Sequence, residues 1–407
     1  MEGRSRLRRV APLIELDDAR ACVLEATAPL APEPVALEDA LGRVLAEEVR
    51  ADADVPAFAN SAMDGYALRA ADSGAGARLR IVGESRAGAP AEVAVGPGEA
   101  CLISTGAALP QGADAVIRVE DTRRDGDVVE LSCGVDAGRD VRRAGDDLRA
   151  GEVVLVPGTR LGPAELGVLA SVGRPTLLAG PRPRVALVTT GDELVGVDDP
   201  LPPGGVRNSG RFVIPALVER AGGETVSVAA ARDEAALTRE VIAAALELGD
   251  AVVITGGMSV GAHDHVRPAL DALGVRQRFA GVALRPGKPA FFGTRGATLV
   301  FGLPGNPVSS LVCFLLFARP ALLALAGESP ERVRTVAVLE RDVERAPGRA
   351  HAARCQLVLH EDGWHAVDTG PQGSHILTSM IGADALAIIP PGDGVVSAGE
   401  RVVVELL

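Results

Sequence analysis

Lysine, asparagine and tyrosine are almost missing from this 407-residue sequence. Its one lysine is Lys288, its one tyrosine is Tyr66, and its three asparagines are Asn60, Asn208 and Asn306. All five lie in short loops that contain Gly, Ser or Pro: NSAMDGY, RNSG, PGKP and PGNP. Functional side chains concentrate on loops carried by a rigid scaffold, although turns also favour asparagine for structural reasons. These four loops are therefore candidates for function.

Other shortages exclude whole classes of protein. Aromatic residues make up 2% of the chain, so the core must consist of aliphatic side chains and alanine. The five cysteines are far apart and form no CxxC pair and no zinc spacing, which indicates a reduced, cytoplasmic environment. The net charge is −13 and no long segment is basic, which argues against binding to nucleic acid.

Membrane association is not expected either. The basic N-terminal RSRLRR is not followed by the apolar region of a secretion signal. The longest apolar run, SSLVCFLLFARPALLALAG, is interrupted by Arg319 and Pro320 and is predicted to be too short to span a bilayer. We therefore expect a cytoplasmic protein without a nucleic-acid or membrane partner.

Residues 184–327 alternate apolar, β-branched runs with helical stretches, which is typical of a parallel sheet with helices on both faces. The predicted strands are RVALVTT, ETVSVAA, DAVVIT and TLVFG. DEAALTREVIAAALELG is a predicted helix, with Asp233 as its N-cap candidate and Gly249 at its end. RFAGVAL and PAFFGT are predicted to pair as a hairpin around RPGK.

The remaining segments predict a multidomain α/β protein. Residues 1–50 contain two helical stretches, LDDARACVLEAT and LEDALGRVLAEEV, which are expected to join 146–180 in a discontinuous, mixed helical linker domain. Residues 51–145 read as an inserted β-rich domain. Residues 181–328 form the doubly wound, mostly parallel α/β domain, and 329–407 a small C-terminal domain that is β-barrel-like.

Three loops follow the predicted parallel strands directly: TGDEL (190–194), TGGMSVGAHDH (255–265) and LPGNPVSS (303–310). Ligands of a doubly wound sheet bind beyond the carboxyl ends of its strands, so these loops are expected at one edge of the sheet. The second loop carries small residues ahead of a helix, a pattern typical of an anion cradle. Its cradle residues are Thr255, Gly256, Gly257, Ser259 and Gly261.

Three acids, Asp192, Glu193 and Asp264, are expected near the presumed anion, because their loops leave the same edge of the sheet. Carboxylates repel a phosphate unless a cation lies between them, and Mg²⁺ suits a few carboxylates together with substrate phosphates. Asp264 can equally cap the helix that follows it. The flanking His263 and His265 have no third ligand nearby, which favours exposed or helix-capping histidines over a zinc or iron site.

Two further short stretches carry charge in a turn. Arg285 and Lys288 in RPGKP form a local positive site for an anionic substrate. Asp64 precedes Gly65 in ANSAMDGYAL, and an Asp-Gly pair indicates a hairpin turn. A turn of this kind can also hold its carboxylate out for chemistry, so the two interpretations of Asp64 are compatible.

Eight ordered stretches, which run over most of the chain, resemble the molybdopterin molybdenumtransferases, the MoeA-type enzymes related to the C-terminal part of gephyrin. They are NSAMDGYA, ISTGAALPQGADAVI, RRAGDDLRAGE, TTGDEL, TGGMSVGAHD, RPGKP, GLPGNPVSS and QGSH. The resemblance implies an α/β domain of the molybdopterin-binding type and a homodimer, with a site between the α/β domain of one subunit and the inserted domain of the other. It implies a Mg²⁺-dependent transferase of molybdenum cofactor biosynthesis, which takes adenylylated molybdopterin and molybdate, releases AMP and leaves molybdenum on the dithiolene.

The resemblance and the loops together give the expected site residues. The catalytic positions are Asp64, Glu193, Asp264, Lys288 and Arg285, with Glu193 and Asp264 at the metal. The substrate-binding positions are Thr105, Asp147, Asp233, Thr255, Gly256, Gly257, Ser259, Gly261, Pro304, Asn306, Pro307, Arg354 and Ser374. Arg285 stands where the family commonly has lysine, so a planar fork replaces a point charge.

The resemblance leaves alternatives open. The same α/β domain occurs in molybdopterin adenylyltransferases, and a chain of this kind can also serve as a carrier or scaffold that holds the pterin. A separate molybdopterin adenylyltransferase and the molybdoenzymes that accept the cofactor are the macromolecular partners to expect. The motifs do not distinguish molybdate from tungstate, because both are tetrahedral oxyanions of similar size.

Overall fold

The structure is a computed structural model that describes residues 12–258, 264–331 and 333–407. Its contacts divide the chain into two compact units. Unit 1 comprises Met1–Glu33, Gly42–Ala46 and Leu178–Leu407, and unit 2 comprises Pro34–Leu41 and Glu47–Leu177. The finer division into four domains stays a prediction.

Unit 1 contains a six-stranded sheet in the order β17-β14-β18-β22-β21-β19. Neighbours among β17 (Glu224–Ala231), β14 (Arg184–Thr190), β18 (Ala251–Thr255) and β22 (Thr298–Leu303) pair in parallel. At the other end of the sheet, β21 (Phe291–Arg295) pairs in the antiparallel sense with both β22 and β19 (Arg276–Ala280). The predicted mostly parallel α/β domain is confirmed.

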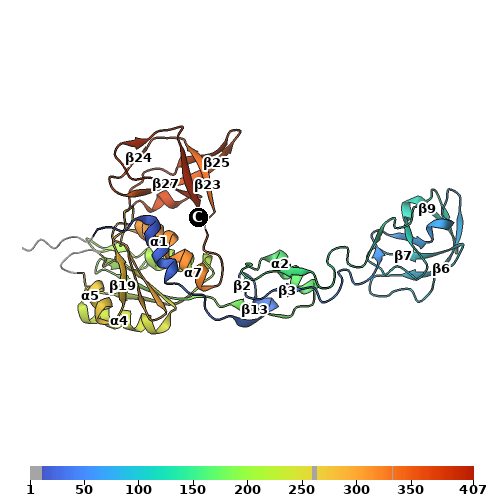
Figure 1. Ribbon diagram of the computed structural model, residues 1–407, viewed down its shortest axis with the longest axis horizontal. Helices are drawn as coiled ribbons and strands as arrows, with labels where there is room; N and C mark the ends of the chain where they lie inside the picture. Colours follow the sequence, from blue (N-terminus) through green and yellow to red (C-terminus); the bar gives the residue numbers. More distant parts are fainter. Residues whose placement is uncertain (1–11, 259–263, 332) are drawn as a thin grey trace, which may run out of the picture. The chain divides into compact units, whose positions relative to one another are not determined.

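Alternating strand residues point to two cores, one on each face of this sheet. Val185 and Leu187 of β14 pack with α1 (Leu16–Glu25), α3 (Gly210–Arg220) and the helix that begins at Pro307. Their neighbours along β14 face α4 (Ala235–Leu248) and α5 (Val266–Ala272) on the opposite side (Figure 1). Full burial stabilises by roughly 1.5–3 kcal/mol per large apolar side chain, so both faces of the sheet are held firmly.

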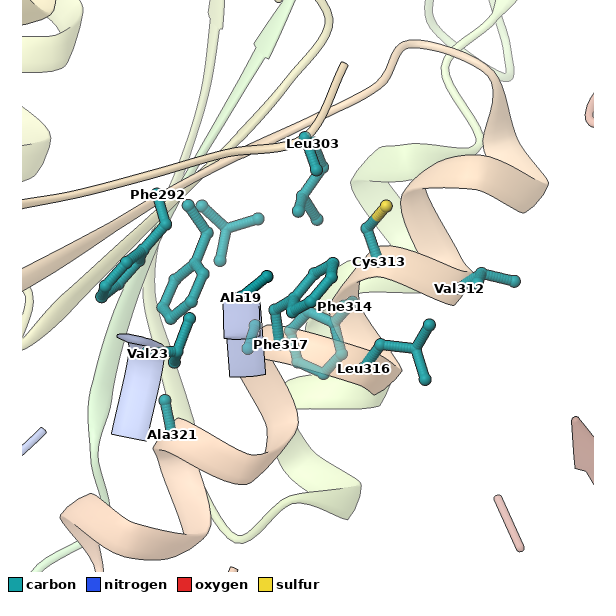
Figure 2. Packing of buried hydrophobic residues seen from close by; sticks show 14 of the residues in the cluster. Ala19, Val23, Phe292, Leu303, Val312, Cys313, Phe314, Leu316, Phe317 and Ala321 are labelled. Atoms are coloured by element: carbon teal, nitrogen blue, oxygen red, sulfur yellow. The ribbon is translucent and has the colours of Figure 1, made fainter. Parts of the chain in front are cut away.

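The longest apolar run of the sequence forms the centre of the first core. Figure 2 shows Phe314, Leu316 and Phe317 of this run packed with Ala19 and Val23 of α1. The run continues without a break through α6 (Pro307–Cys313), a π-helical segment (Phe314–Ala318) and α7 (Arg319–Leu325). Its 19 residues are long and apolar enough to cross a membrane, so the expectation that the run is too short is wrong, but 83% of its apolar window is buried within the protein.

Two helical predictions need correction. LEDALGRVLAEEV forms only a short 3-10 turn, Leu37–Asp39, and then the strands β2 (Val44–Leu45) and β3 (Val49–Arg50). Gly42, between the 3-10 turn and β2, has a φ of +74°, which an α-helix does not permit. In the second case α4 begins after Glu234 and not after Asp233, and no side chain caps it.

The C-terminal part of unit 1 is a small closed barrel. Its strands are β23 (Arg334–Leu339), β25 (Ala350–His360), β26 (Gly363–Asp368), β27 (Ala385–Ile389) and β29 (Arg401–Leu406), in the order β25-β26-β23-β29-β27. The barrel closes because β25 also pairs with β27. The predicted β-barrel-like C-terminal domain is therefore confirmed.

A short strand connects this barrel to the α/β part of unit 1. The predicted hairpin exists, because β19 pairs with β21. However, β20 (Leu284–Arg285) leaves it and pairs with β25, which sets Arg285 opposite His351.

Unit 2 is β-rich, as predicted for 51–145. Its main sheet has the order β8-β5-β7-β6-β10-β9, with β5 (Gly65–Leu68) between β8 (Ala115–Arg118) and β7 (Glu99–Ile103). The outer strands are β6 (Arg78–Ser85), β10 (Val128–Leu131) and β9 (Thr122–Asp125). The helix α2 (Pro163–Ser171) lies in the segment 146–180, for which a mixed helical domain was predicted.

Candidate functional site

The three loops predicted at one edge of the unit 1 sheet lie together. The register aligns Thr189 of β14 with Thr255 of β18, and Thr255 with Leu303 of β22, so the loops that follow leave at the same level. Glu193, Thr255 and Pro307, one from each loop, line a small cavity of about 90 Å³. Polar groups from all three predicted loops therefore meet at the carboxyl ends of the strands.

Glycines in the loop after β18 permit the backbone of that loop to lie close to the end of β14. Gly256 and Gly257 have φ values of +87° and +62°, a region that other residues rarely adopt. A Cβ on Gly256 would lie 2.6 Å from the carbonyl oxygen of Thr190. The Gly256 amide donates to the Leu303 carbonyl over 3.1 Å, so this predicted cradle amide is not available to an anion. Ser259 and Gly261 lie outside the described residues.

The acids of this edge have different surroundings. The carboxylate of Glu193 folds over Gly191, where an added Cβ would come within 2.5 Å of its Oε2. Asp192 accepts a 3.2 Å hydrogen bond from the Asp233 amide, which places Asp233 beside the loop after β14. The structure thus brings Asp233 to the strand edge, although not as a helix cap.

The two carboxylate oxygens of Asp264 have different surroundings. Its Oδ1 accepts a 3.2 Å bond from the Val266 amide at the start of α5, but the N-cap residue of α5 is His265, so Asp264 precedes the cap position. Its Oδ2 is buried and has no hydrogen-bond partner among the described residues. Burial raises the pKa of this carboxyl above its ordinary value, and the Val266 bond opposes that shift. A cation beside Oδ2 would satisfy the oxygen and stabilise its charge.

The PGNP loop contacts the QGSH loop of the barrel. The Asn306 side chain donates a 3.2 Å hydrogen bond to the Ser374 hydroxyl, and the Val308 amide donates to the Ser374 carbonyl over 3.2 Å. Pro304 is buried before this turn, and Pro307 is the first residue of α6. Two predicted substrate-binding residues, Asn306 and Ser374, are therefore in direct contact.

Arg354 anchors the other end of the same loop. Its side chain is fully buried, at 0% exposure. Nη2 donates to the carbonyls of Gly373 and Pro371 over 3.3 and 3.5 Å, and Nε donates to the Ser379 hydroxyl over 3.2 Å. Within the described part of the chain, no carboxylate pairs with Arg354 and nothing accepts a hydrogen bond from its Nη1. A buried charge left in this state is costly and favours an anionic ligand.

Arg354 is also one of the residues that line a cavity of about 510 Å³. Four of the lining residues have a positive or titratable side chain: Arg285, Arg341, His351 and Arg354. Each acid of the wall already has a partner. Asp342 accepts from the Ala398 amide, Glu344 pairs with Arg285, and Asp368 pairs with Arg341. Burial, together with the nearby Arg285, lowers the pKa of Arg354 to about 10, so it is still charged at neutral pH. The cavity therefore suits an anion.

His351 is a wall residue that the sequence did not reveal. Its Nδ1 lies 2.8 Å from the Glu344 carbonyl, which makes Nδ1 the donor and leaves Nε2 as a lone-pair nitrogen. Nε2 is buried and has no partner among the described residues. Burial lowers the pKa of His351, and the charges of Arg285 and Arg354 lower it further. Only the β20–β25 pairing brings it to Arg285, and no motif marks that pairing.

The RPGKP residues have separate roles in the structure. Arg285 reaches Glu344 at 3.5 Å and lines the larger cavity. Lys288 is exposed, and no ion pair to it is formed within the described ranges. Because no carboxylate of the described residues pairs with the ammonium of Lys288, that group is open to an incoming anion.

The remaining predicted residues lie in unit 2, which is described by itself. Oδ1 of Asp64 accepts two bonds from Thr105, from the amide at 2.7 Å and from the hydroxyl at 3.0 Å. These bonds lower the pKa of the exposed Asp64 carboxyl. Asp147 is also exposed.

The hairpin interpretation of Asp64-Gly65 is wrong. Gly65 is the first residue of β5 and does not adopt a left-handed φ. Glycine is required there for another reason: a Cβ would lie 1.9 Å from the Ile117 carbonyl oxygen of the neighbouring strand β8.

Comparison with known proteins adds a consistent result. Residues 14–173 match the MoeA N-terminal region (domain I and II), residues 186–324 a probable molybdopterin binding domain, and residues 336–407 the MoeA C-terminal region (domain IV). The molybdopterin molybdenumtransferase of Haemophilus influenzae is 34% identical over 97% of this chain and 98% of its own length. That of Bacillus subtilis is 34% identical over 92% and 90%. A crystal structure of the molybdopterin biosynthesis MoeA protein from Pyrococcus horikoshii superposes with a TM-score of 0.80, at 32% identity, over 97% of this chain and 99% of that one.

Proposed function

The chain belongs to the molybdopterin molybdenumtransferase family, and from this premise we propose that it transfers molybdenum from molybdate to adenylylated molybdopterin and releases AMP. The reaction breaks the phosphoanhydride bond between pterin and nucleotide and leaves molybdenum on the dithiolene sulfurs. The substrates are anionic, so their binding sites must supply positive charge and hydrogen-bond donors.

One observation carries the proposal: Arg354, which lines a cavity of about 510 Å³, has a buried Nη1 without a partner among the described residues. A tetrahedral oxyanion such as molybdate supplies the acceptor and the negative charge that Arg354 lacks. Arg285, which lines the same cavity, adds a second guanidinium. His351 Nε2 offers an acceptor to a protonated oxygen of the anion.

The loop anchored on Arg354 connects this oxyanion site to the strand edge. Arg354 holds the carbonyl of Gly373, and the next residue, Ser374, contacts Asn306 at the start of α6. One short loop therefore lies between the two proposed sites: its Arg354 end is at the cavity for the oxyanion, and its Ser374 end is at the strand edge for the pterin phosphate. We assign the cavity to molybdate and the edge to the adenylylated pterin.

The acids at the edge fit a magnesium ion. Asp264 has a buried oxygen without a partner in the described chain, and Glu193 lines the small cavity at the edge. Mg²⁺ commonly takes one or two carboxylates and completes its shell with water and substrate phosphates, so two acids suffice. Glu193 and Asp264 would hold the ion, which neutralises charge on the phosphoanhydride when bound.

The remaining charged residues stabilise developing charge and orient the reacting groups. Lys288 and Arg285 neutralise the negative charge that develops as the phosphoanhydride breaks. Asp64, kept ionised by Thr105, orients the metal, the water or the molybdate. On the strength of the family resemblance, the proposal includes a homodimer in which the inserted domain of one subunit supplies Asp64 to the other, and a cytoplasmic location.

A single incubation separates this function from its alternatives. Purified protein is given adenylylated molybdopterin, molybdate and Mg²⁺, and nucleotides are measured by chromatography. The proposed transferase releases AMP, and exhaustive EDTA treatment abolishes that release. A molybdopterin adenylyltransferase would instead consume ATP when given unmodified molybdopterin, and a carrier would do neither.

A further inference from the structure

A cluster of histidine and carboxylate side chains lies on the C-terminal barrel. Glu340, His360 and His365 each bring one potential ligand atom to within 4.8 Å of the other two. They come from three strands: Glu340 follows β23, His360 ends β25, and His365 lies in β26.

Strand register explains why the three meet. His360 is opposite Gly363 and Val358 is opposite His365, so both histidines face the same side of the β25–β26 hairpin. Their rings stack with centroids 4.2 Å apart and planes inclined by 25°. β23 pairs with β26 at Val338 and His365, which brings the end of β23 to the same place. The arrangement is set by the backbone and not by a chance meeting of long side chains.

The ring of His365 is held between two carboxylates. Its Nε2 lies 2.9 Å from Oδ1 of Asp362, and its Nδ1 is in close contact with Oε1 of Glu340. Both contacts fit a protonated ring, in which Nδ1 and Nε2 each donate to a carboxylate. His360 supplies a further nitrogen beside them, and a divalent cation bound by the three side chains would take the place of a ring proton.

The donor set selects the kind of cation. Two imidazoles and one carboxylate suit zinc and its neighbours in the first transition row, whereas Mg²⁺ prefers oxygen ligands only. In tetrahedral zinc sites the ligand atoms are roughly 3.3 Å apart, given bonds of about 2.0–2.1 Å. Glu340 and His360 are exposed, so small side-chain rotations suffice to close the site. Asp362 then fixes the orientation of the His365 ring by accepting a hydrogen bond from its Nε2, a common arrangement for metal-bound histidine.

We propose that Glu340, His360 and His365 bind one divalent transition-metal ion, zinc by its donor set, which ties the β25–β26 hairpin to the end of β23. The fourth ligand is water. The ion is structural, lies outside the catalytic residues described above, and is independent of the magnesium ion proposed for Glu193 and Asp264.

Metal binding to the full-length chain tests the proposal. Protein freed of metal with a chelator is titrated with Zn²⁺ in a calorimeter, in the presence of millimolar Mg²⁺, and then with Co²⁺, whose visible absorption reports nitrogen ligands and tetrahedral geometry. We expect Mg²⁺-resistant binding of Zn²⁺, a tetrahedral Co²⁺ spectrum and a higher Tm of the zinc-loaded protein.

The decisive variant is His360→Gln, because His360 is exposed and its loss leaves the barrel core intact. It should lose one equivalent of Zn²⁺ relative to the wild type and lose the Co²⁺ spectrum, while its metal-free Tm is unchanged. Asp362→Asn should weaken binding by about 10- to 100-fold. Glu361→Gln, an exposed neighbour outside the cluster, is the matched control and should bind like the wild type. Zinc binding by His360→Gln equal to that of the wild type, or no binding by the wild type, would overturn the proposal.

Discussion

The side-chain amide of Asn306 donates a 3.2 Å hydrogen bond to the hydroxyl of Ser374, 68 residues farther along the chain. Asn306 lies at the start of α6, at the edge of the parallel sheet, and Ser374 belongs to the barrel loop that Arg354 anchors. This bond joins the loop that Arg354 anchors to the strand edge within unit 1. It also explains why the chain keeps one of its three asparagines here.

Removal of the Arg354 guanidinium should weaken molybdate binding. Because Nη1 is the unpaired buried donor, Arg354→Met should lower molybdate affinity by about 10- to 100-fold, the scale of a lost charged hydrogen bond. Isothermal titration measures the affinity. Arg401→Met, an exposed arginine of the same barrel, is the control and should bind normally.

The same residue anchors a loop, so folding must be checked separately. Arg354→Lys keeps the charge but not the fork, and it should bind molybdate with an affinity between those of the wild type and Arg354→Met. Unchanged affinity in a folded Arg354→Met protein would remove Arg354 from the oxyanion site.

Loss of the single lysine should affect turnover and not stability. Lys288 is exposed, so Lys288→Ala should leave Tm within about 1 °C, because surface substitutions are usually near neutral. AMP release should fall by about 100-fold, the scale of losing one preorganised charge at the reacting phosphates. Arg276→Ala, an exposed cation on β19, should retain full turnover. If Lys288→Ala turns over like Arg276→Ala, Lys288 does not act on the substrate.

Asp64→Asn should separate chemistry from folding. Asparagine keeps an oxygen that can accept both Thr105 bonds, so the variant should melt normally. Without the charge, AMP release should fall by about 100-fold or more. Asp264→Asn should behave likewise, and near-normal release by either variant would remove that acid from the chemistry.

Mixing these two inactive variants tests the proposed homodimer. After complete subunit exchange roughly half of the dimers are mixed, and each has one site with both native acids, so activity should recover to about a quarter of that of the wild type if sites are independent. No recovery despite demonstrated exchange would place both acids of a site on one chain.

A salt bridge of unit 2 predicts a pH dependence of stability. Arg118 makes two bonds to Asp140, at 2.8 and 3.0 Å, and they hold the pKa of Asp140 below its ordinary value of 3.8. A lowered native pKa stabilises the fold at pH values above the unfolded pKa, and that contribution is lost as the pH falls through the native pKa.

Asp140→Asn should therefore lower Tm by about 2 °C at neutral pH, a modest value because the pair is partly exposed. Asparagine also tolerates the φ of +50° at this position. The difference from the wild type should shrink below about pH 4. Asp136→Asn, an exposed acid nearby, should show no such difference. A Tm difference that persists unchanged into acid would contradict the ionic origin.

Strong periodic signals predicted the architecture. The α/β alternation of 184–327 predicted the parallel sheet and the three candidate loops at its edge, because long buried strands and helices are determined largely by local pattern. Boundaries and faces were less accurate. In α4 the apolar side chains of Leu237 and Leu248 are at least 40% exposed, and the buried side chains are Ile242, Ala245 and Leu246 with Thr238.

The local sequence pattern could not predict contacts between segments that are distant along the chain. The oxyanion cavity depends on β20 leaving its hairpin to pair with β25, which brings Arg285 to His351 and Arg354. β20 has only two residues, and both pair with the start of β25, so the segment is too short to carry a strand pattern in the sequence. Similarly, Gly65 is dictated by the carbonyl of Ile117 on another strand and not by a turn.

The coupling of molybdenum transfer to AMP release is the central claim, and one time course tests it directly. The protein is incubated with adenylylated molybdopterin, Mg²⁺ and isotopically labelled molybdate, and both AMP and pterin-bound molybdenum are measured. The account predicts that the two products appear in equal amounts and that neither appears with Asp64→Asn. AMP release without retention of molybdenum on the pterin, or retention without AMP, would contradict it.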